Sequence, residues 1–319
     1  MELTDSQLNY FVNNRLKLPK GKRADYLAQV DHLIERFSAA ADGDKVIDTK
    51  KFLKTGSLRK GTVLRPRGDF GVDADVAVFL NPNGASQYDL ANLHGRIRRL
   101  LAKIYPTKKP EDFTIQPRTL GIQFRDSGLE MDLVPLMVID GPGDYGLQPS
   151  SQGDAPIKTS VTKQLEFIRA RKDAYAHFTA LVRLLKFWRN FRELDESLRS
   201  FTIELIVSHL QDVRGVPPSL EDGLLRFFLY VADSQLRTPI AFKECGRPKS
   251  FPKDRVVILD PCNADNNVTR KITDQDCTAI VEKCLAAWET LSYARNYDGK
   301  VQTLELWKEI FGRSFVIED

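Results

Sequence analysis

Hydrophobic and polar residues alternate most regularly between Val72 and Leu80, where every second residue is apolar. A period of two is typical of a β-strand that buries one face, so this segment is predicted to be a strand. The same period predicts strands at residues 119–125 and 129–137. Because the turn signal Asp-Ser-Gly joins these two segments, they are predicted to form a hairpin.

The apolar residues follow a helical period in most of the remaining chain. Residues 4–40 are predicted to be helical with a break at Pro19, and residues 86–105 form another predicted helix. A polar segment at residues 140–160 is predicted to cross between two lobes or to flank an active cleft. A short strand is predicted at residues 255–260. The helices predicted beyond residue 161 are 177–194, 201–210, 220–236, 274–293 and 301–311.

The composition is that of an ordinary globular protein, with 319 residues, 42% hydrophobic and 28% charged. The 47 Lys and Arg residues nearly balance the 43 Asp and Glu residues, so the net charge of +4 does not by itself indicate nucleic-acid binding. The helix at residues 86–105 has a basic face, for which a solvated surface is the favoured interpretation over RNA or DNA binding.

The chain carries no signal for a membrane or for secretion. No segment approaches the roughly 20 apolar residues of a membrane span, and the N-terminal residues are polar and acidic. The four cysteines lack CxxC spacing and have no histidine near them, which favours reduced thiols over a zinc site. We therefore expect a cytoplasmic protein.

The strand at residues 72–80 begins with two carboxylates, Asp73 and Asp75, on its polar face. They stand roughly 5–7 Å apart, where like charges repel each other, and each carboxylate prefers water. A divalent cation makes this arrangement favourable, since Mg²⁺ binds one or two carboxylates and leaves room for phosphates and water. Asp132, which shares a face with Glu130, would be a third acid if the hairpin lies beside this strand. Three such acids predict two-metal phosphoryl or nucleotidyl transfer.

Gly56 and Ser57 precede this strand in the sequence GSLRKGT. Backbone amides beside a glycine, together with a serine hydroxyl, suit a phosphate group. The motif differs from a Walker A loop, because Lys60 stands before Gly61 instead of after the last glycine.

A resemblance follows from the order of the motifs GSLRKGT, DADVAVFL, GLEMDLVP, LVRLLKFW, LRSFTIELI and LDPCNADNNV. The Gly-Ser pair, the Asp-x-Asp strand and a third Asp on a later strand are similar to the polymerase-β-type nucleotidyltransferase superfamily. The full set, from Phe52 to Phe315, resembles the bacterial cGAS/DncV-like nucleotidyltransferases, which are relatives of oligoadenylate synthetase and cGAS.

This resemblance implies an α+β fold. A polymerase-β-type nucleotidyltransferase lobe, with a mixed sheet and helices, would be joined to a mainly helical C-terminal lobe and braced by a long N-terminal helix. The implied domains are residues 1–160, with the N-terminal helix and the catalytic core, and residues 161–319, which would be similar to the helical lobe of oligoadenylate synthetase.

The resemblance also implies a function. The chain would make a cyclic di- or trinucleotide containing adenine from ATP and other NTPs, as a second messenger in bacterial antiphage (CBASS) signalling. The implied partners are a protein regulator, which is a HORMA-domain protein in one branch of the family, and a nuclease effector that reads the product. The implied catalytic residues and ligands of two Mg²⁺ ions, with Mn²⁺ as an alternative, are Asp73, Asp75 and Asp132. The implied nucleotide-binding residues are Gly56, Ser57, Lys186 and Ser200.

Residues in the helical half keep two interpretations each. Lys186 fits a lysine that snorkels to the surface, or, by resemblance, a ligand of the triphosphate. Ser200 fits a helix N-cap, or a phosphate contact at the positive end of the same helix. Asn266 and Asn267 fit Asx turns that satisfy their own backbone, or residues near the cleft.

Two other functions are compatible with the sequence. A polymerase-β-type enzyme that adds nucleotides to RNA ends would bind RNA in a salt-sensitive way. An inactive member of the fold would bind nucleic acid or a protein. The presence of all three carboxylates argues against the inactive alternative.

Overall fold

The computed structural model describes residues 1–42, 44, 47–67, 71–81, 87–246 and 250–318, with side chains in the helix after residue 86 described from Asn92 onward. The chain forms two compact units. One contains Leu18–Leu165, and the other combines Met1–Lys17 with Glu166–Asp319. The first seventeen residues therefore group with the later part of the chain.

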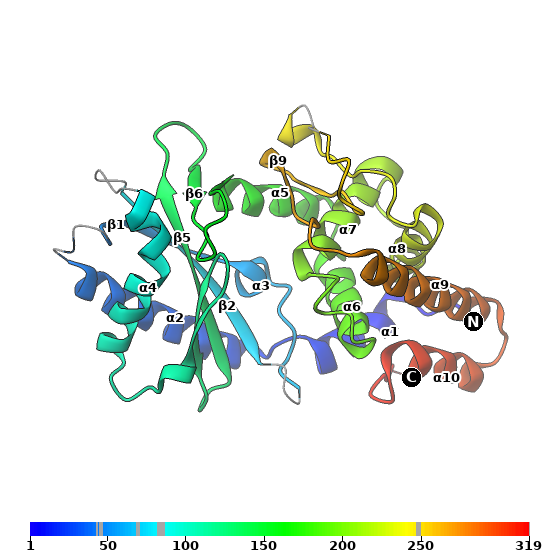
Figure 1. The fold of residues 1–319 in the computed structure, drawn as a ribbon. Helices are drawn as coiled ribbons and strands as arrows, with labels where there is room; N and C mark the ends of the chain where they lie inside the picture. Colours follow the sequence, from blue (N-terminus) through cyan, green and yellow to red (C-terminus); the bar gives the residue numbers. More distant parts are fainter. Residues whose placement is uncertain (43, 45–46, 68–70, 82–86, 247–249, 319) are drawn as a thin grey trace. The chain divides into compact units, whose positions relative to one another are not determined.

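The Leu18–Leu165 unit is built on a mixed sheet, which has seven strands in the described residues (Figure 1). The main order is β1-β2-β5-β4-β3, and β6 and β7 extend it from β5. The pair β2 and β5 is parallel, and the other pairs are antiparallel. The strands are β1 (Thr49–Thr55), β2 (Val72–Leu80), β3 (Phe113–Ile115), β4 (Leu120–Phe124), β5 (Leu129–Val138), β6 (Gly146–Gln148) and β7 (Ile157–Thr159).

The predicted strands of this sheet and the hairpin are confirmed. Strand β2 has the predicted bounds, and β4 pairs with β5 in antiparallel fashion across the turn at residues 125–128. Gly128 in this turn has a φ of 69°, a left-handed conformation that glycine adopts without steric cost. The hairpin lies beside β2, as the sequence predicted, with β5 as the direct neighbour.

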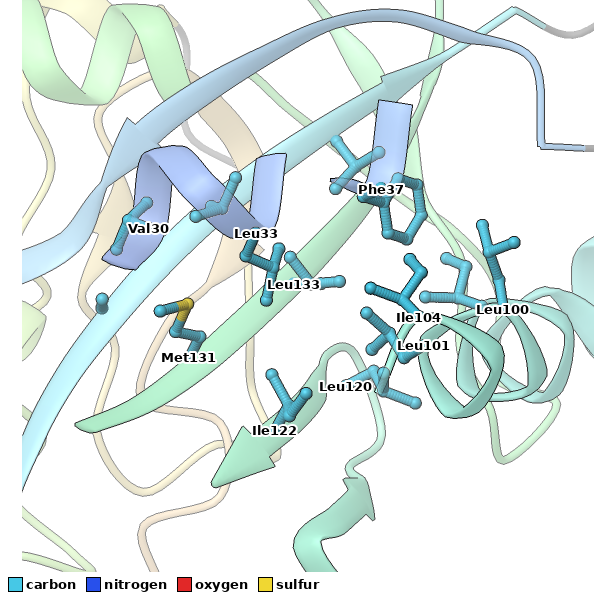
Figure 2. Packing of buried hydrophobic residues seen from close by; sticks show 14 of the residues in the cluster. Val30, Leu33, Phe37, Leu100, Leu101, Ile104, Leu120, Ile122, Met131 and Leu133 are labelled. Carbon is cyan, nitrogen blue, oxygen red and sulfur yellow. The ribbon is translucent and has the colours of Figure 1, made fainter. Parts of the chain in front are cut away.

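Two helices, α2 (Lys20–Ala41) and α4 (Gln87–Ile104), pack against one face of this sheet (Figure 2). The predicted first residue of the second helix, Ser86, lies outside the described residues. Burial of each large apolar side chain contributes roughly 1.5–3 kcal/mol, so this core fixes which strand face points inward. The core side chains labelled in Figure 2 are Val30, Leu33, Phe37, Leu100, Leu101, Ile104, Leu120, Ile122, Met131 and Leu133. All five apolar residues of alternating register in β2 belong to this core: Val72, Ala74, Val76, Val78 and Leu80.

The other face of the sheet carries a smaller core around Ala77, Phe79, Leu136 and Val161. This cluster lies toward the C-terminal ends of β2 and β5. Asp73 and Asp75 lie on the same face at the start of β2, so this end of the face is left polar.

The second unit is mainly helical, as predicted. Its helices are α1 (Asp5–Phe11), a π-helical turn η1 (Val12–Leu16), α6 (Phe178–Phe191), α7 (Ser200–Arg214), α8 (Leu220–Ser234), α9 (Asp274–Asn296) and α10 (Lys300–Phe311). Helix α5 (Val161–Ala174) begins in the first unit and continues into the second. The short elements are η2 (Pro110–Asp112) in the first unit, and η3 (Lys243–Cys245), β8 (Leu259–Asp260) and β9 (Asn263–Asn267) in the second.

The N-terminal residues join this unit through an aromatic core. The Phe11 ring centroid lies 4.8 Å from that of Phe315, which stacks on Trp307 at 5.2 Å. The predicted break at Pro19 is confirmed, because α2 begins directly after it at Lys20. The helical residues before and after the break therefore belong to different units.

The α+β fold predicted from the sequence is confirmed. The bracing role of the N-terminal helix stays a prediction, as do the domain limits at residues 160 and 161. None of the described helices combines the length and the apolar character that a membrane crossing requires.

Candidate active site

The parallel pairing of β2 and β5 brings the predicted acids together. Asp75 lies opposite Asp132 in the register, and Asp73 lies opposite Glu130. Register partners on neighbouring strands are about 4.8 Å apart and point to the same face. The structure thus gathers four carboxylates at one end of one sheet face, from exposed Asp73 to half-buried Asp75, Glu130 and Asp132.

Burial is the main reason that the pKa of Asp132 rises to about 7. The negative charges of Asp75, Glu130 and Asp73 raise it further. Burial and the Asp73 charge also raise the pKa of Glu130. One oxygen of Asp132, Oδ1, is buried without a hydrogen-bond partner. A carboxylate with an unpaired oxygen among like charges is stabilised by a cation, because a cation removes the repulsion and uses the lone pair.

The acids do not form a complete metal cage by themselves. In the part of the chain that the structure describes, no three His, Cys, Asp or Glu side chains converge closely enough to hold a metal ion between them. Magnesium commonly takes one or two protein carboxylates and completes its shell with water and phosphates. The residues therefore fit an ion that arrives with a nucleotide, and the assignment of Asp73, Asp75 and Asp132 as ligands stays a prediction.

Gly56 lies directly against Asp75. It begins the short helix α3 (Gly56–Lys60) with a φ of 62°. A Cβ atom at this position would be 1.6 Å from Oδ2 of Asp75 and 2.5 Å from its Cγ. Any other residue here would combine backbone strain with displacement of the Asp75 carboxylate. The structure thus gives Gly56 a steric role beside the predicted phosphate contact.

Gly121 is a second close approach, which the sequence analysis missed. It lies opposite Asp132 in the β4–β5 register, and a Cβ atom there would be 3.1 Å from Oδ1 of Asp132 and 3.2 Å from Oε1 of Glu130. An isolated glycine inside a predicted strand often marks a close approach, and this was the available signal.

Lys186 is buried on α6 and retains only 6% of its exposure. The alternative of a lysine that snorkels to the surface is therefore wrong. The same helix also buries Arg183 and Arg189. Buried cations are costly unless hydrogen bonds or opposite charges surround them. The three cations on this helix are therefore expected to have partners or a functional role.

Ser200 is the first residue of α7, and the N-cap position belongs to Arg199. The predicted N-cap at Ser200 is therefore wrong by one residue, because the helix begins at Ser200 instead of Phe201. The Ser200 hydroxyl accepts a hydrogen bond from Nη1 of Arg189 at 3.2 Å. This contact links α7 to α6, which also carries Lys186.

The predicted site residues fall into two groups. Gly56, Ser57 and the three acids belong to the Leu18–Leu165 unit, and Lys186 and Ser200 belong to the helical unit. Their roles as site residues stay predictions.

Asn267 has a structural role, in agreement with the Asx-turn interpretation. Its Oδ1 accepts from the amides of Ile258 and Thr269, and its Nδ2 donates to the carbonyl of Val256. Asn266 donates to Oδ2 of Asp260 at 3.2 Å. The predicted strand at residues 255–260 is correspondingly shorter, because side chains of the loop occupy the Ile258 amide and only Leu259–Asp260 forms β8.

Comparison with known proteins gives close matches over the whole chain, although no protein-family model matches it. The chain is 38% identical over 319 residues to the CBASS oligonucleotide cyclase CdnC of Escherichia coli strain KTE188, with 100% of this chain and 99% of the relative covered. It is 33% identical over 313 residues to a cyclic AMP-AMP-AMP synthase of E. coli strain MS 115-1, with 96% and 95% covered.

Solved structures agree with these relatives. E. coli MS115-1 CdnC with ATP matches with a TM-score of 0.83 and 31% identity, over 98% of this chain and 99% of that one. The complex of that CdnC with HORMA-deltaN matches with a TM-score of 0.81 and 31% identity, over 98% of both chains. Vibrio cholerae DncV shares the fold. It matches with a TM-score of 0.75 and 13% identity, over 98% of this chain and 97% of that one.

Proposed function

Because this chain belongs to the CBASS oligonucleotide cyclases of the cGAS/DncV-like nucleotidyltransferase family, we propose that it uses ATP and Mg²⁺ to make a cyclic oligonucleotide that contains adenine. The resemblance stated from the sequence is confirmed, and the chain is a nucleotidyltransferase that makes cyclic oligonucleotides. This membership favours the cyclase over an RNA-tailing enzyme and over an inactive binding protein. A cytoplasmic location stays a prediction.

The observation that carries the magnesium proposal is the environment of Asp132. Its Oδ1 atom has no hydrogen-bond partner, and burial together with three other carboxylates raises its pKa. We propose that Asp73 and Asp75 hold both ions and that Asp132 holds one of them. When bound, the ions would activate the attacking hydroxyl and neutralise the triphosphate and the leaving pyrophosphate. Mn²⁺ is an alternative ion for the same oxygen ligands.

The residues of this chain would then divide the work. Asp132 accepts the proton of the attacking ribose hydroxyl while the α-phosphorus–oxygen bond forms and pyrophosphate leaves. Gly56 keeps Asp75 in place, and Ser57 donates to a phosphate oxygen. Lys186 and Ser200 bind the triphosphate, a role that rests on the family motifs LVRLLKFW and LRSFTIELI.

ATP as the substrate is supported by relatives. A relative that is 33% identical is named a cyclic AMP-AMP-AMP synthase, and a solved CdnC structure contains ATP. We therefore propose a cyclic trinucleotide of AMP as the first product to test. The test is incubation of the purified chain with radiolabelled ATP, the other NTPs and Mg²⁺, with products resolved by mass. A cyclic product that contains adenine supports the proposal, and a linear tail added to RNA overturns it.

A protein regulator is the second part of the proposal. CdnC of E. coli MS115-1 has been solved in complex with HORMA-deltaN, so we propose a HORMA-domain partner for this chain. A purified HORMA-domain protein is expected to raise the rate of product formation when it is added. It is also expected to co-elute with the chain in gel filtration. Unchanged rate and separate elution argue against a HORMA regulator. The nuclease effector that reads the product rests on the family resemblance alone.

A further inference from the structure

Helix α6 carries three buried cations at every third position, Arg183, Lys186 and Arg189, which keep 8%, 6% and 7% of their exposure. Lys186 is part of the proposed nucleotide site, whereas Arg189 has no role in the proposed function. A buried guanidinium is retained only where its donors are used, so its contacts indicate what it does.

All three nitrogen atoms of the Arg189 guanidinium donate hydrogen bonds. Nη1 donates to the carbonyl of Leu198 at 3.1 Å and to the hydroxyl of Ser200 at 3.2 Å. Nε and Nη2 donate to Oδ1 of Asn190 at 2.9 and 2.6 Å. The guanidinium is therefore anchored by its neighbour Asn190 and directed at the two residues that flank the N-cap of α7, Arg199.

The contact with Arg189 determines how the Ser200 hydroxyl is used. A hydroxyl has one hydrogen to donate and two lone pairs to accept with. Because a lone pair of Ser200 accepts from Arg189, the hydroxyl hydrogen stays available for another acceptor. Because the Arg189 donor is charged, it also polarises the hydroxyl, and this strengthens the hydrogen bond that the hydroxyl donates. The second contact, with the Leu198 carbonyl, fixes the chain that enters α7.

We propose that Arg189 is a positioning residue, which holds Ser200 in the orientation that donates its hydroxyl hydrogen to an anion, the triphosphate of the nucleotide. This inference rests on the proposed nucleotide-binding role of Ser200. Arg189 acts through Ser200 and is not itself a phosphate ligand. Lysine cannot replace it, because a single ammonium lacks the planar fork that reaches Asn190, Leu198 and Ser200 together.

The test is a double-mutant cycle between Arg189→Met and Ser200→Ala, measured as the Kd of a nonhydrolysable ATP analogue with Mg²⁺ by calorimetry. We expect each single variant to weaken binding by roughly tenfold, the effect of one lost hydrogen bond to a charged group. The double variant is expected to bind no more weakly than Ser200→Ala alone. A purely structural role for Arg189 would instead weaken binding equally with and without the Ser200 hydroxyl.

Two further variants keep the test decisive if Arg189→Met does not fold. Arg189→Lys keeps the buried charge, and Asn190→Ala leaves Arg189 intact while removing its anchor. Both are expected to weaken binding several-fold in the wild-type background and to have no effect with Ser200→Ala. The matched control is Arg199→Gln, which removes an exposed charge beside Ser200 that pairs with Glu196. It is expected to leave the Kd within about twofold.

The outcomes separate this inference from the proposed function. Unchanged binding by Ser200→Ala overturns both the triphosphate role of Ser200 and the positioning role of Arg189. Weaker binding by Ser200→Ala, with an Arg189→Met effect of the same size in both backgrounds, overturns the positioning role alone. A loss of binding in Arg199→Gln as large as in Arg189→Met also overturns it, because general charge would then explain both.

Discussion

Asp132 in the sheet unit and Glu221 in the helical unit are two carboxylic acids whose burial raises the pKa to about 7. Their neighbours differ in sign. Around Asp132 the next contributions come from three other carboxylates, which raise the pKa further. Around Glu221 the next contributions come from the Leu3 amide and from Arg295, which lower the pKa, and the smaller contributions of Glu2 and Asp222 raise it. The amide donates to Oε2 of Glu221 at 2.7 Å.

This difference separates an acid with structural contacts, Glu221, from the acid that we propose for catalysis, Asp132. Glu221 accepts the Leu3 amide at Oε2 and lies 4.0 Å from Nε of Arg295 through Oε1, which has no hydrogen-bond partner, and it ties the N-terminal residues to the start of α8. Asp132 is buried beside three like charges, an arrangement that no gain in folding stability explains. Similar pKa values therefore carry opposite meanings, and the groups that cause them decide which meaning applies.

The largest effect is expected when two of the acids around Asp132 are removed, which tests the difference between Asp132 and Glu221. Asp73→Asn combined with Asp75→Asn is expected to keep the fold and to lower product formation by on the order of 10³-fold or more, because the ion ligands are lost. Product formation is measured by mass and folding by circular dichroism. Pyrophosphate release at the wild-type rate in a folded double variant would contradict the assignment of these acids.

The next test displaces one acid without changing its charge. Gly56→Ala places a methyl group where the Asp75 carboxylate lies, 1.6 Å from Oδ2, so Asp75 has to move. A shift of about 1 Å at a reacting centre costs roughly 10²-fold in rate. We expect this loss in kcat, with binding of the ATP analogue reduced less.

The matched control for that variant is Gly61→Ala. Gly61 has a φ of 76°, close to the 62° of Gly56, but no atom lies within 4 Å of a Cβ built there. It is expected to cost about 1 kcal/mol of stability through backbone strain alone and to keep most of the activity. Equal loss of activity in both variants would attribute the effect to backbone strain instead of to Asp75.

The structural role of Glu221 is tested through the free energy of unfolding. The pKa of Glu221 is raised from 4.5 to about 7 in the folded state, so the folded chain binds a proton that the unfolded chain releases between these pH values. The free energy of unfolding therefore falls by up to about 3 kcal/mol as the pH rises through this window. Glu221→Gln is expected to reduce this dependence in urea unfolding, with the contribution of Asp132 remaining, and to leave product formation nearly unchanged.

The rate of product formation by Glu221→Gln shows whether Glu221 differs from Asp132 in function, just as its stability does. A loss of product formation comparable to that of the Asp73 and Asp75 variants would show that Glu221 belongs to the chemistry. A pH dependence identical to that of the wild type would show that a different group causes it.

The smallest expected effect is at Gly121. A Cβ atom there would lie 3.1 Å from Oδ1 of Asp132, close enough to require a shift of a few tenths of an ångström but no larger displacement. Gly121→Ala is expected to lower the rate by a few-fold while the fold is kept. Both kcat and the free energy of unfolding of this variant are measured. A proportional loss of the two would indicate general destabilisation of β4.

Much of the fold followed from local patterns. The alternation in β2 predicted its bounds and its two faces, because side-chain direction in a strand depends on position alone. The turn signal before β5 predicted the hairpin for a similar reason. The first residue of α7 was missed by one position, which is within the one or two residues by which helix ends commonly differ.

The sequence by itself determined which acids stand on one face, where the chain turns, and the motif order that identifies the family. These are properties of neighbours along the chain. Only the tertiary structure decided that Asp75 presses against Gly56, that Gly121 makes room for Asp132, and that Arg189 holds Ser200. Those contacts join residues on different helices and strands, and their geometry is set when the elements pack against one another.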